Sequence, residues 1–189
     1  MRKKQSNQLA ANAMLLGIML IIQIFSTIFF QIFPFPIKPT LIHIPVIIGS
    51  IVYGPRVGAS LGFFMGFISL VTNTLMPQPT SYLFSPLAPG GSFDSILIAI
   101  LPRVMIGLLP FYIYKLIHNR FGLALAGLTG SLTNTILVLA AIFLLFGKVY
   151  QGDITKLLAA VVASNSLLEM FLAAFLTLAI VPVLEKAKR

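Results

Sequence analysis

The sequence predicts an all-α integral membrane protein, a single membrane domain (residues 1–189) in which six transmembrane helices form a bundle with both chain ends in the cytoplasm. Three observations support this prediction: the composition, the length of the apolar runs and the placement of the basic residues. Of the 189 residues, 58% are hydrophobic and 9% are charged, and the mean hydropathy is +1.02. Soluble domains carry about 25% charged residues, so this chain has too few polar groups to cover a surface that faces water.

Six apolar segments are expected to cross the bilayer as helices. About 20 residues of α-helix span a hydrocarbon core of about 30 Å, and within lipid a helix satisfies its own backbone hydrogen bonds. None of the segments shows the alternation of apolar and polar residues that is typical of a membrane β-strand. The expected helices are residues 9–33, 40–53, 57–75, 93–117, 121–146 and 154–184.

The first three helices are delimited by proline and glycine. Residues 9–33 follow a basic start and end before Pro34. At about 25 residues this run is longer than the roughly 7–15 apolar residues of a signal peptide, so we expect a retained helix. Residues 40–53 form a short helix that ends at Gly54, and residues 57–75 end before a proline-rich stretch.

The last three helices are longer. Residues 93–117 contain Pro102 and Pro110, which should bend the fourth helix. Residues 121–146 form the fifth helix and residues 154–184 the sixth.

The orientation follows from the Lys and Arg residues near the helix ends, which concentrate on the cytoplasmic side of membrane proteins. With the amino terminus inside, nine of the 13 Lys and Arg residues lie on the cytoplasmic side and three lie outside, while Arg103 alone lies within a span. The cytoplasmic nine are Arg2, Lys3, Lys4, Arg56, Lys115, Arg120, Lys186, Lys188 and Arg189, and the outer three are Lys38, Lys148 and Lys156.

Several classes of function are disfavoured by what the sequence lacks. The net charge of +9 does not indicate nucleic-acid binding, because the basic residues stand at the ends of apolar runs. The absence of cysteine excludes disulfides and thiolate chemistry. There is no HExxH, GxSxG or phosphate-binding GxxxxGK(S/T) motif, so no enzyme activity, cofactor or metal is expected. An active transporter of this kind would need energy from a partner or from an ion gradient.

A long outer loop, residues 76–92, separates the third and fourth helices. It holds four prolines and two glycines, but also apolar side chains such as Tyr82, Leu83 and Phe84. A plain connector would be polar throughout, and loops of this length in compact domains are usually functional or disordered. We favour a lid over an outward-facing cavity, with a plain connector as the alternative.

Two ionisable residues lie inside predicted spans, where charge is costly and usually functional. Arg103 lies in the outer half of the fourth helix and Glu169 near the middle of the sixth. They could form a structural ion pair, or Arg103 could extend outward to the interface. Alternatively, the guanidinium could bind an anionic group of a ligand through forked hydrogen bonds, and a ligand carboxylate could compete with Glu169.

Side-chain amides and a histidine form a second set of candidates. Asn165 and Glu169, four residues apart, share one face of the sixth helix. Asn134 lies midway along the fifth helix, and Asn73 and His43 lie near the outer ends of the third and second. Each could bridge helices, at about 0.6–2 kcal/mol, or contact a ligand. Ligand binding is favoured for the set, because the polar residues of the last three helices fall beneath the proposed lid.

Small residues recur at a spacing of four, which lets helices approach closely. Gly58, Gly62 and Gly66 form one such face on the third helix, and Ala13 and Gly17 form another on the first. Internal packing explains this spacing, and a docking face for another membrane subunit is the alternative on the first helix.

Several short motifs extend across most of the chain. The pattern HIPVIIGSIVYGPRVGASLGF begins at His43, and the others are Phe84-Ser85-Pro86, Leu101-Pro102-Arg103, Gly130-Ser131-Leu132-Thr133-Asn134-Thr135 and Asn165-Ser166-Leu167-Leu168-Glu169. In these motifs the chain resembles the substrate-binding S components of energy-coupling factor (ECF) transporters, which import vitamins in prokaryotes.

The resemblance implies a six-helix bundle in the prokaryotic plasma membrane that binds a vitamin near its outer face. The substrate would lie between helices four to six and the loops after helices one and three. The resemblance also implies association with a transmembrane coupling subunit and two cytoplasmic ATPases, and a carrier that topples in the membrane to release its substrate. In this family a docking face on the first helix resembles AxxxA, and here the matching pair is Ala13 and Gly17.

Within the superfamily the motifs are most like the pantothenate type. Pantothenate is a small hydroxylated amide with a carboxylate, which Arg103 suits, while the asparagines suit its hydroxyl and amide groups. Riboflavin is an alternative that would need more aromatic stacking, to which Tyr82 and Phe84 could contribute, and a pyridoxine-related compound is another. The candidate substrate-binding residues are therefore His43, Asn73, Tyr82, Phe84, Arg103, Asn134, Asn165 and Glu169.

A self-sufficient secondary transporter is the less expected alternative. Such a protein should show two related halves or buried carboxylates for a coupling ion. The sequence has no convincing internal repeat, and Glu169 is its one acid near mid-membrane.

Overall fold

The computed structural model describes residues 2–33, 40–77, 80–146 and 166–188, which form α-helices and one 3-10 turn and include no strand. Five of these helices are long and apolar enough to cross a membrane. The elements are α1 (Arg2–Ile32), α2 (His43–Tyr53), α3 (Pro55–Leu75), the 3-10 turn η1 (Ser81–Leu83), α4 (Asp94–Leu116), α5 (Arg120–Phe146) and α7 (Leu167–Ala187). The predicted all-helical class is confirmed.

The helix bounds agree with the sequence prediction where proline or glycine sets them, and differ elsewhere. The first helix begins at Arg2 rather than residue 9, because the polar and basic residues before the apolar run continue the helix. The last helix extends to Ala187, and residues 154–165 of the predicted sixth helix lie outside the described residues. With 11 residues, α2 is about 17 Å long at 1.5 Å per residue, about half of a hydrocarbon core. The described part of the chain therefore holds five membrane-length helices and one shorter helix.

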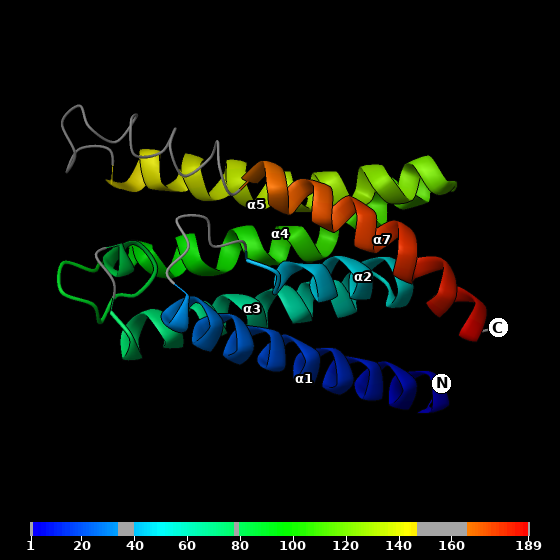
Figure 1. The fold of residues 1–189 in the computed structure, drawn as a ribbon, viewed down its shortest axis with the longest axis horizontal. Coiled ribbons are helices and arrows are strands. Elements are labelled where there is room, and N and C mark those ends of the chain that lie inside the picture. The colour runs from blue at the N-terminus through cyan, green and yellow to red at the C-terminus, as the bar shows by residue number, and fades with distance from the viewer. Residues whose placement is uncertain (1, 34–39, 78–79, 147–165, 189) are drawn as a thin grey trace.

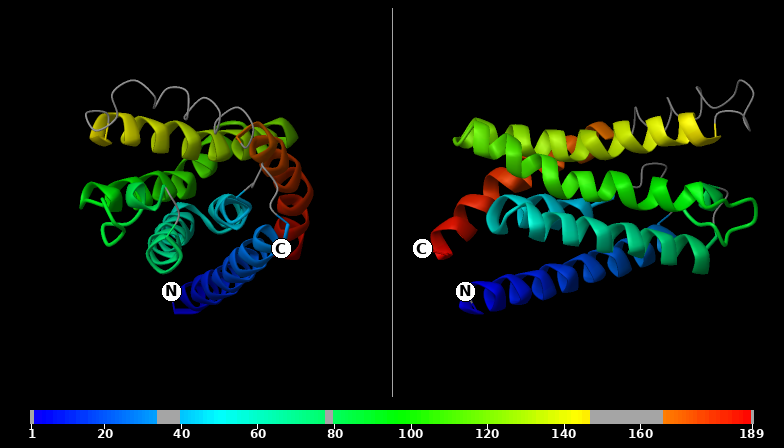
Figure 2. Two further views of the ribbon diagram at one scale, coloured as in Figure 1. Left: turned by 60° about the vertical axis from the view of Figure 1, so that its left-hand side comes forward. Right: turned by 180° about the vertical axis from the view of Figure 1, so that it is seen from behind.

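The short helix α2 is the core of the bundle. Every residue from His43 to Val52 is buried, and α2 contacts α1, α3, α4, α5 and α7. Figure 2 shows α1 and α5 on opposite sides of the bundle, with α2 between them. An entirely apolar run such as Ile44–Ile48 can be buried on all sides only at such a central position.

The close approach of α3 and α4 depends on the glycines that the sequence spacing singled out. A Cβ atom at Gly58 would collide with the backbone oxygen of Gly107, and one at Gly62 with that of Arg103. At Gly66 a Cβ would lie 2.7 Å from the oxygen of Ala99. Internal packing is thus confirmed as the role of the glycine face of α3, and it fixes the backbone position of Arg103.

Both chain ends lie at one end of the bundle, and the loop between α3 and α4 lies at the other (Figure 1). At the end that carries the termini, Lys188 links α7 to the end of α2. Its Nζ donates a hydrogen bond to the backbone oxygen of Val52 at 2.7 Å and lies 5.1 Å from the centre of the Tyr53 ring. The hydroxyl of Tyr114 in α4 donates to Glu185 in α7 at 3.5 Å. The last turn of α7 is thereby attached to α2 and α4.

Candidate functional site

The first turn of α2 and the first described turn of α7 lie partway along the bundle (Figure 1). These turns carry two of the residues expected at a substrate site, His43 and Glu169. Both side chains are buried, with 0% of His43 and 5% of Glu169 exposed. A buried polar region therefore lies in the interior of the bundle, between its two ends.

The carboxylate of Glu169 is held by Thr40. The backbone nitrogen and the hydroxyl of Thr40 each donate a hydrogen bond to Oε1 of Glu169, both at 2.6 Å. Hydrogen bonds of this length to an ionised oxygen are among the stronger ones in proteins. They attach the residues that lead into α2 to the first turn of α7.

The ion pair that the sequence allowed between Arg103 and Glu169 is absent from the part of the chain that the structure describes. Arg103 instead donates from Nη1 to the backbone oxygen of Ile98 at 2.7 Å, and its guanidinium lies 5.2 Å from the centre of the Phe84 ring. The side chain is 8% exposed, so it does not extend to the surface either. The two charges have separate partners because Arg103 turns back toward the start of α4.

Several buried polar atoms near this region have no hydrogen-bond partner among the described residues. They are both ring nitrogens of His43, Nε of Arg103, Oδ1 of Asn134 and Oγ of Ser131. Leaving a buried donor or acceptor unpaired costs about 1–3 kcal/mol, and natural proteins rarely accept that cost without a functional reason. Among the described residues, these atoms therefore have hydrogen-bonding capacity that the protein itself does not use.

The unpaired groups of α5 and α2 lie at a similar depth in the bundle. Ser131 and Asn134 are three residues apart and share one face of α5. The adjacent Gly130 packs on Ile47 of α2, where a Cβ would lie 2.7 Å from the Ile47 side chain. Asn134 is one turn beyond Gly130 and His43 one turn before Ile47, and the two helices run in opposite directions (Figure 1). Both residues therefore lie on the loop side of that contact.

The described part of the loop 76–92 is folded against the bundle. Leu83 is buried against Ile98 of α4 and against Ile142 and Phe146 of α5. The ring of Tyr82 meets that of Phe146 edge to face, with the ring centres 6.2 Å apart. Tyr82 and Leu83 thus cover the ends of α4 and α5 on the loop side of the bundle, and Phe84 lies over the guanidinium of Arg103.

Three hydrogen bonds attach this loop to α3 and α4. The hydroxyl of Ser81 donates to Oδ1 of Asn73 at 2.8 Å, and the hydroxyls of Thr74 and Ser85 are 2.6 Å apart. From α4, the hydroxyl of Ser95 donates to the backbone oxygen of Tyr82 at 2.6 Å. The second atom of the Asn73 amide, Nδ2, donates to the backbone oxygen of Ser69 at 2.8 Å. Asn73, expected as a ligand contact, thus supports the loop.

Asn165, another expected site residue, lies outside the described residues. Its neighbour Ser166 is 6% exposed, and its hydroxyl lies 3.1 Å from that of Thr135 in α5. This contact places the start of α7 beside the polar segment of α5 that contains Asn134.

The first helix presents its small residues outward. Its buried face is formed by Ala11, Leu15 and Met19. Ala13 is exposed, and a Cβ added at Gly17 would meet nothing within 4 Å. The pair Ala13 and Gly17 therefore belongs to an open face of α1, free to meet a partner or lipid.

Sequence reasoning missed two residues of this region, Thr40 and Ser131. Ser131 stands three residues before Asn134 in α5, so helical spacing was an available signal for it, whereas Thr40 lies before α2 and has no such signal. The described residues contain no group of three His, Cys, Asp or Glu side chains that could hold a metal ion.

Comparison with known proteins gave two matches. The family model described as "ECF transporter, substrate-specific component" matches residues 7–181. The chain is 47% identical over 193 residues to the pantothenic acid transporter PanT of Lactococcus lactis subsp. cremoris (strain MG1363), and the match covers 100% of this chain and 98% of that protein.

Proposed function

Because this chain belongs to the family of substrate-specific components of ECF transporters, we propose that it is the pantothenate-binding membrane subunit of an ATP-driven vitamin importer. It is a multi-pass protein of the plasma membrane. The observation that carries the proposal is the 47% identity, over the full length of the chain, to a pantothenic acid transporter. The buried polar residues of this chain also suit the carboxylate, hydroxyl and amide groups of pantothenate.

The proposed role of Arg103 is to bind the carboxylate of pantothenate. A guanidinium has five N–H donors, and among the described residues Arg103 makes one hydrogen bond, to the backbone oxygen of Ile98. The Nε–H is buried and unpaired, which leaves it and the other guanidinium donors available for a forked interaction with a carboxylate. The ring of Phe84 covers the guanidinium, and the exclusion of water strengthens such a charge pair.

The hydroxyl and amide groups of pantothenate are matched by neutral side chains. Asn134 and Ser131 of α5 and His43 of α2 provide unpaired acceptors and donors at buried positions. Asn165, one residue before Ser166, is proposed to complete this set. Glu169 is proposed to act indirectly, because its Oε1 is already bonded to Thr40 and holds the segment before His43.

The proposed topology has six membrane crossings with both termini in the cytoplasm. It is supported by the position of both chain ends at one end of the bundle (Figure 1), which an even number of crossings requires. The described basic residues near that end include Arg56, Lys115, Arg120 and Lys186, as the bias of positive charge toward the cytoplasm predicts. The loop 76–92 is then proposed as the outer lid of the site.

The proposed partners are a transmembrane coupling subunit and two cytoplasmic ATPases. The chain has no nucleotide-binding motif of its own, so the energy for import would come from them. The open face of α1 at Ala13 and Gly17 is proposed as the docking surface for the coupling subunit, since small side chains allow close helix contact.

The proposal is tested by calorimetric titration of the purified chain in detergent, without ATP. We expect one pantothenate per chain and no binding of riboflavin or pyridoxine at the same concentrations. Specific binding of riboflavin or pyridoxine instead of pantothenate would contradict the substrate assignment. Uptake of pantothenate into liposomes by this chain alone, driven by an ion gradient, would contradict the proposed dependence on partners.

A further inference from the structure

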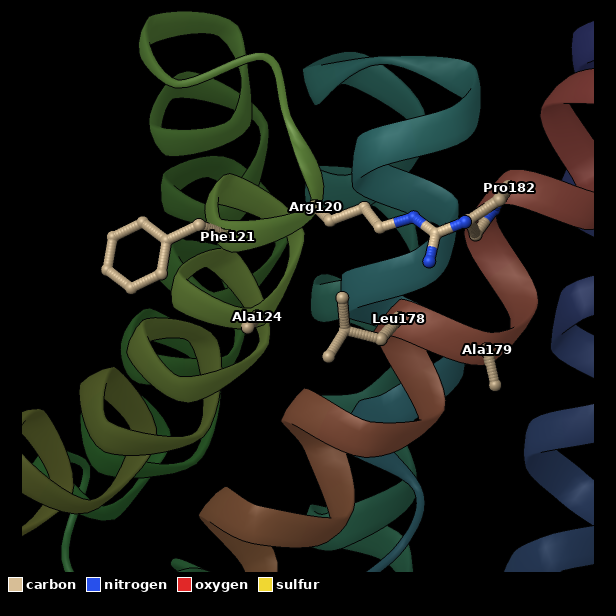
Figure 3. A pocket seen from close by; sticks show the side chains of 6 residues that line it. All are labelled: Arg120, Phe121, Ala124, Leu178, Ala179 and Pro182. Atoms are coloured by element: carbon tan, nitrogen blue, oxygen red, sulfur yellow. The ribbon is translucent and has the colours of Figure 1, made fainter.

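A second feature lies at the end of the bundle that carries the chain termini, away from the proposed vitamin site. Here a groove of about 550 Å³ opens between the start of α5 and the later turns of α7 (Figure 3). Its lining residues are Arg120, Phe121 and Ala124 of α5 and Leu178, Ala179 and Pro182 of α7.

The groove results from the way α5 and α7 cross. At Gly127 the helices are in close contact, since a Cβ there would lie 2.7 Å from the backbone oxygen of Ala173. Beyond this contact α7 runs obliquely away from the start of α5 (Figure 1). The small side chains Ala124 and Ala179 do not fill the widening wedge, so an apolar groove is left between the two helices.

The charge at the mouth of this groove is positive. The Arg120 side chain extends from α5 across to Pro182 of α7 (Figure 3), and among the described residues it has no hydrogen-bond or ion-pair partner. Lys186 follows Pro182 by four residues and so lies on the same side of α7. The nearby acid, Glu185, accepts a hydrogen bond from Tyr114 of α4, which gives its carboxylate a partner away from Arg120.

We propose that this groove binds one anionic phospholipid, with the headgroup phosphate on Arg120 and an acyl chain in the apolar wedge. A guanidinium with free donors recognises phosphate, and basic pockets between helices at a membrane surface hold anionic headgroups. The apolar lining selects a lipid rather than a free phosphate, because only the lipid has a chain to fill it. The proposal is independent of the vitamin and of its site.

The test is native mass spectrometry of the full chain in detergent, titrated with dioleoylphosphatidylglycerol or dioleoylphosphatidylcholine, which share their acyl chains. We expect one phosphatidylglycerol to bind with a preference of about fivefold, the size of one cationic contact at a membrane surface. Arg120→Gln should abolish the preference. Lys115→Gln, which removes an exposed charge of α4 outside the groove, is the matched control and should preserve it.

A second variant tests the acyl chain. Ala179→Phe places a ring in the wedge from an exposed position, and it should weaken the binding of both lipids. Pantothenate binding, measured in parallel, reports whether each variant is folded. The proposal is overturned if Arg120→Gln keeps the wild-type preference, if Lys115→Gln loses it equally, or if glycerol 3-phosphate displaces the lipid. It is also overturned if Ala179→Phe leaves lipid binding unchanged while preventing assembly with the coupling subunit, because the groove is then a protein interface.

Discussion

Thr40 and Glu169 are 129 positions apart in the sequence, yet two hydrogen bonds of 2.6 Å join the exposed Thr40 to the buried carboxylate of Glu169. Because Thr40 stands three residues before the start of α2 and Glu169 lies in the first turn of α7, this contact attaches the segment leading into α2 to the first turn of α7. His43, with its unpaired ring nitrogens, is one turn away. The relationship gives the buried acid a positioning role.

This role predicts that Thr40 and Glu169 act as one unit. Thr40→Val and Glu169→Gln should each weaken pantothenate binding by about 1.5–3 kcal/mol, the range for a hydrogen bond to a charged group. The double variant should lose less than the sum of the two single losses, because both changes act on the bond between the Thr40 hydroxyl and the Glu169 carboxylate. Calorimetric titration of the four proteins measures the coupling. Additive losses, with Glu169→Gln much the larger, would show that Glu169 contacts the ligand itself.

The close packing of α3 against α4 predicts that a side chain added to the glycine face of α3 lowers the stability of the protein and also weakens pantothenate binding. Gly62→Ala places a Cβ against the backbone oxygen of Arg103, so α3 and α4 must separate, at a cost of about 1–3 kcal/mol for overpacking. We expect a lower unfolding temperature in detergent and weaker pantothenate binding. Gly17→Ala, where a Cβ meets nothing within 4 Å, is the matched control and should unfold like the wild type. Equal stability of the two variants would contradict the packing described for α3 and α4.

The hydrogen bonds of the loop 76–92 predict how fast a ligand leaves. Asn73→Ala removes the bond from Ser81, and Thr74→Val removes the bond to Ser85. Each bond is worth about 1 kcal/mol, so each change should speed pantothenate dissociation about fivefold. Stopped-flow displacement of labelled pantothenate gives the rate. If neither change alters dissociation, the loop is a connector and does not act as a lid.

The open face of α1 predicts that bulky substitutions there impair transport by the assembled importer without changing pantothenate binding by the subunit. Replacing both Ala13 and Gly17 by Leu adds bulk where α1 contacts nothing in the described chain. Pantothenate binding to the purified subunit should be unchanged, whereas uptake by the reconstituted importer should fall at least tenfold. Gly17→Ala keeps a small side chain and should preserve uptake. Normal uptake by the Leu variant would place the docking surface elsewhere.

Much of the fold could be predicted because few backbone structures are stable within lipid. Apolar runs bounded by proline or glycine became helices with similar limits, as for α3, which ends at Leu75 as predicted. The central position of α2 could not be predicted in the same way. Its short length was visible in the sequence, but its burial on all sides depends on five neighbouring helices that sequence periodicity does not identify.

The sequence indicated which polar residues would be buried better than it indicated their hydrogen-bond partners. Arg103 and Glu169 are both buried, but the ion pair that the sequence left open as one alternative is not formed among the described residues, where their partners are a backbone oxygen and a threonine. Backbone groups leave no mark in a sequence pattern, and Thr40 resembles any other polar residue at a helix start. The direction of the Arg103 side chain depends on the loop residue Phe84 above it, which only the folded chain defines.

The central claim is that Arg103 binds the carboxylate of pantothenate. It is tested most directly by titrating wild type and Arg103→Ala with pantothenate and with pantothenol, in which an alcohol replaces the carboxylate. Circular dichroism and gel filtration establish that the variant is folded. We predict that Arg103→Ala weakens pantothenate binding by about 2–5 kcal/mol, the range for truncating one partner of a buried charge pair, and leaves pantothenol binding nearly unchanged. Unchanged pantothenate affinity in the folded variant, or an equal loss for both compounds, would contradict the account.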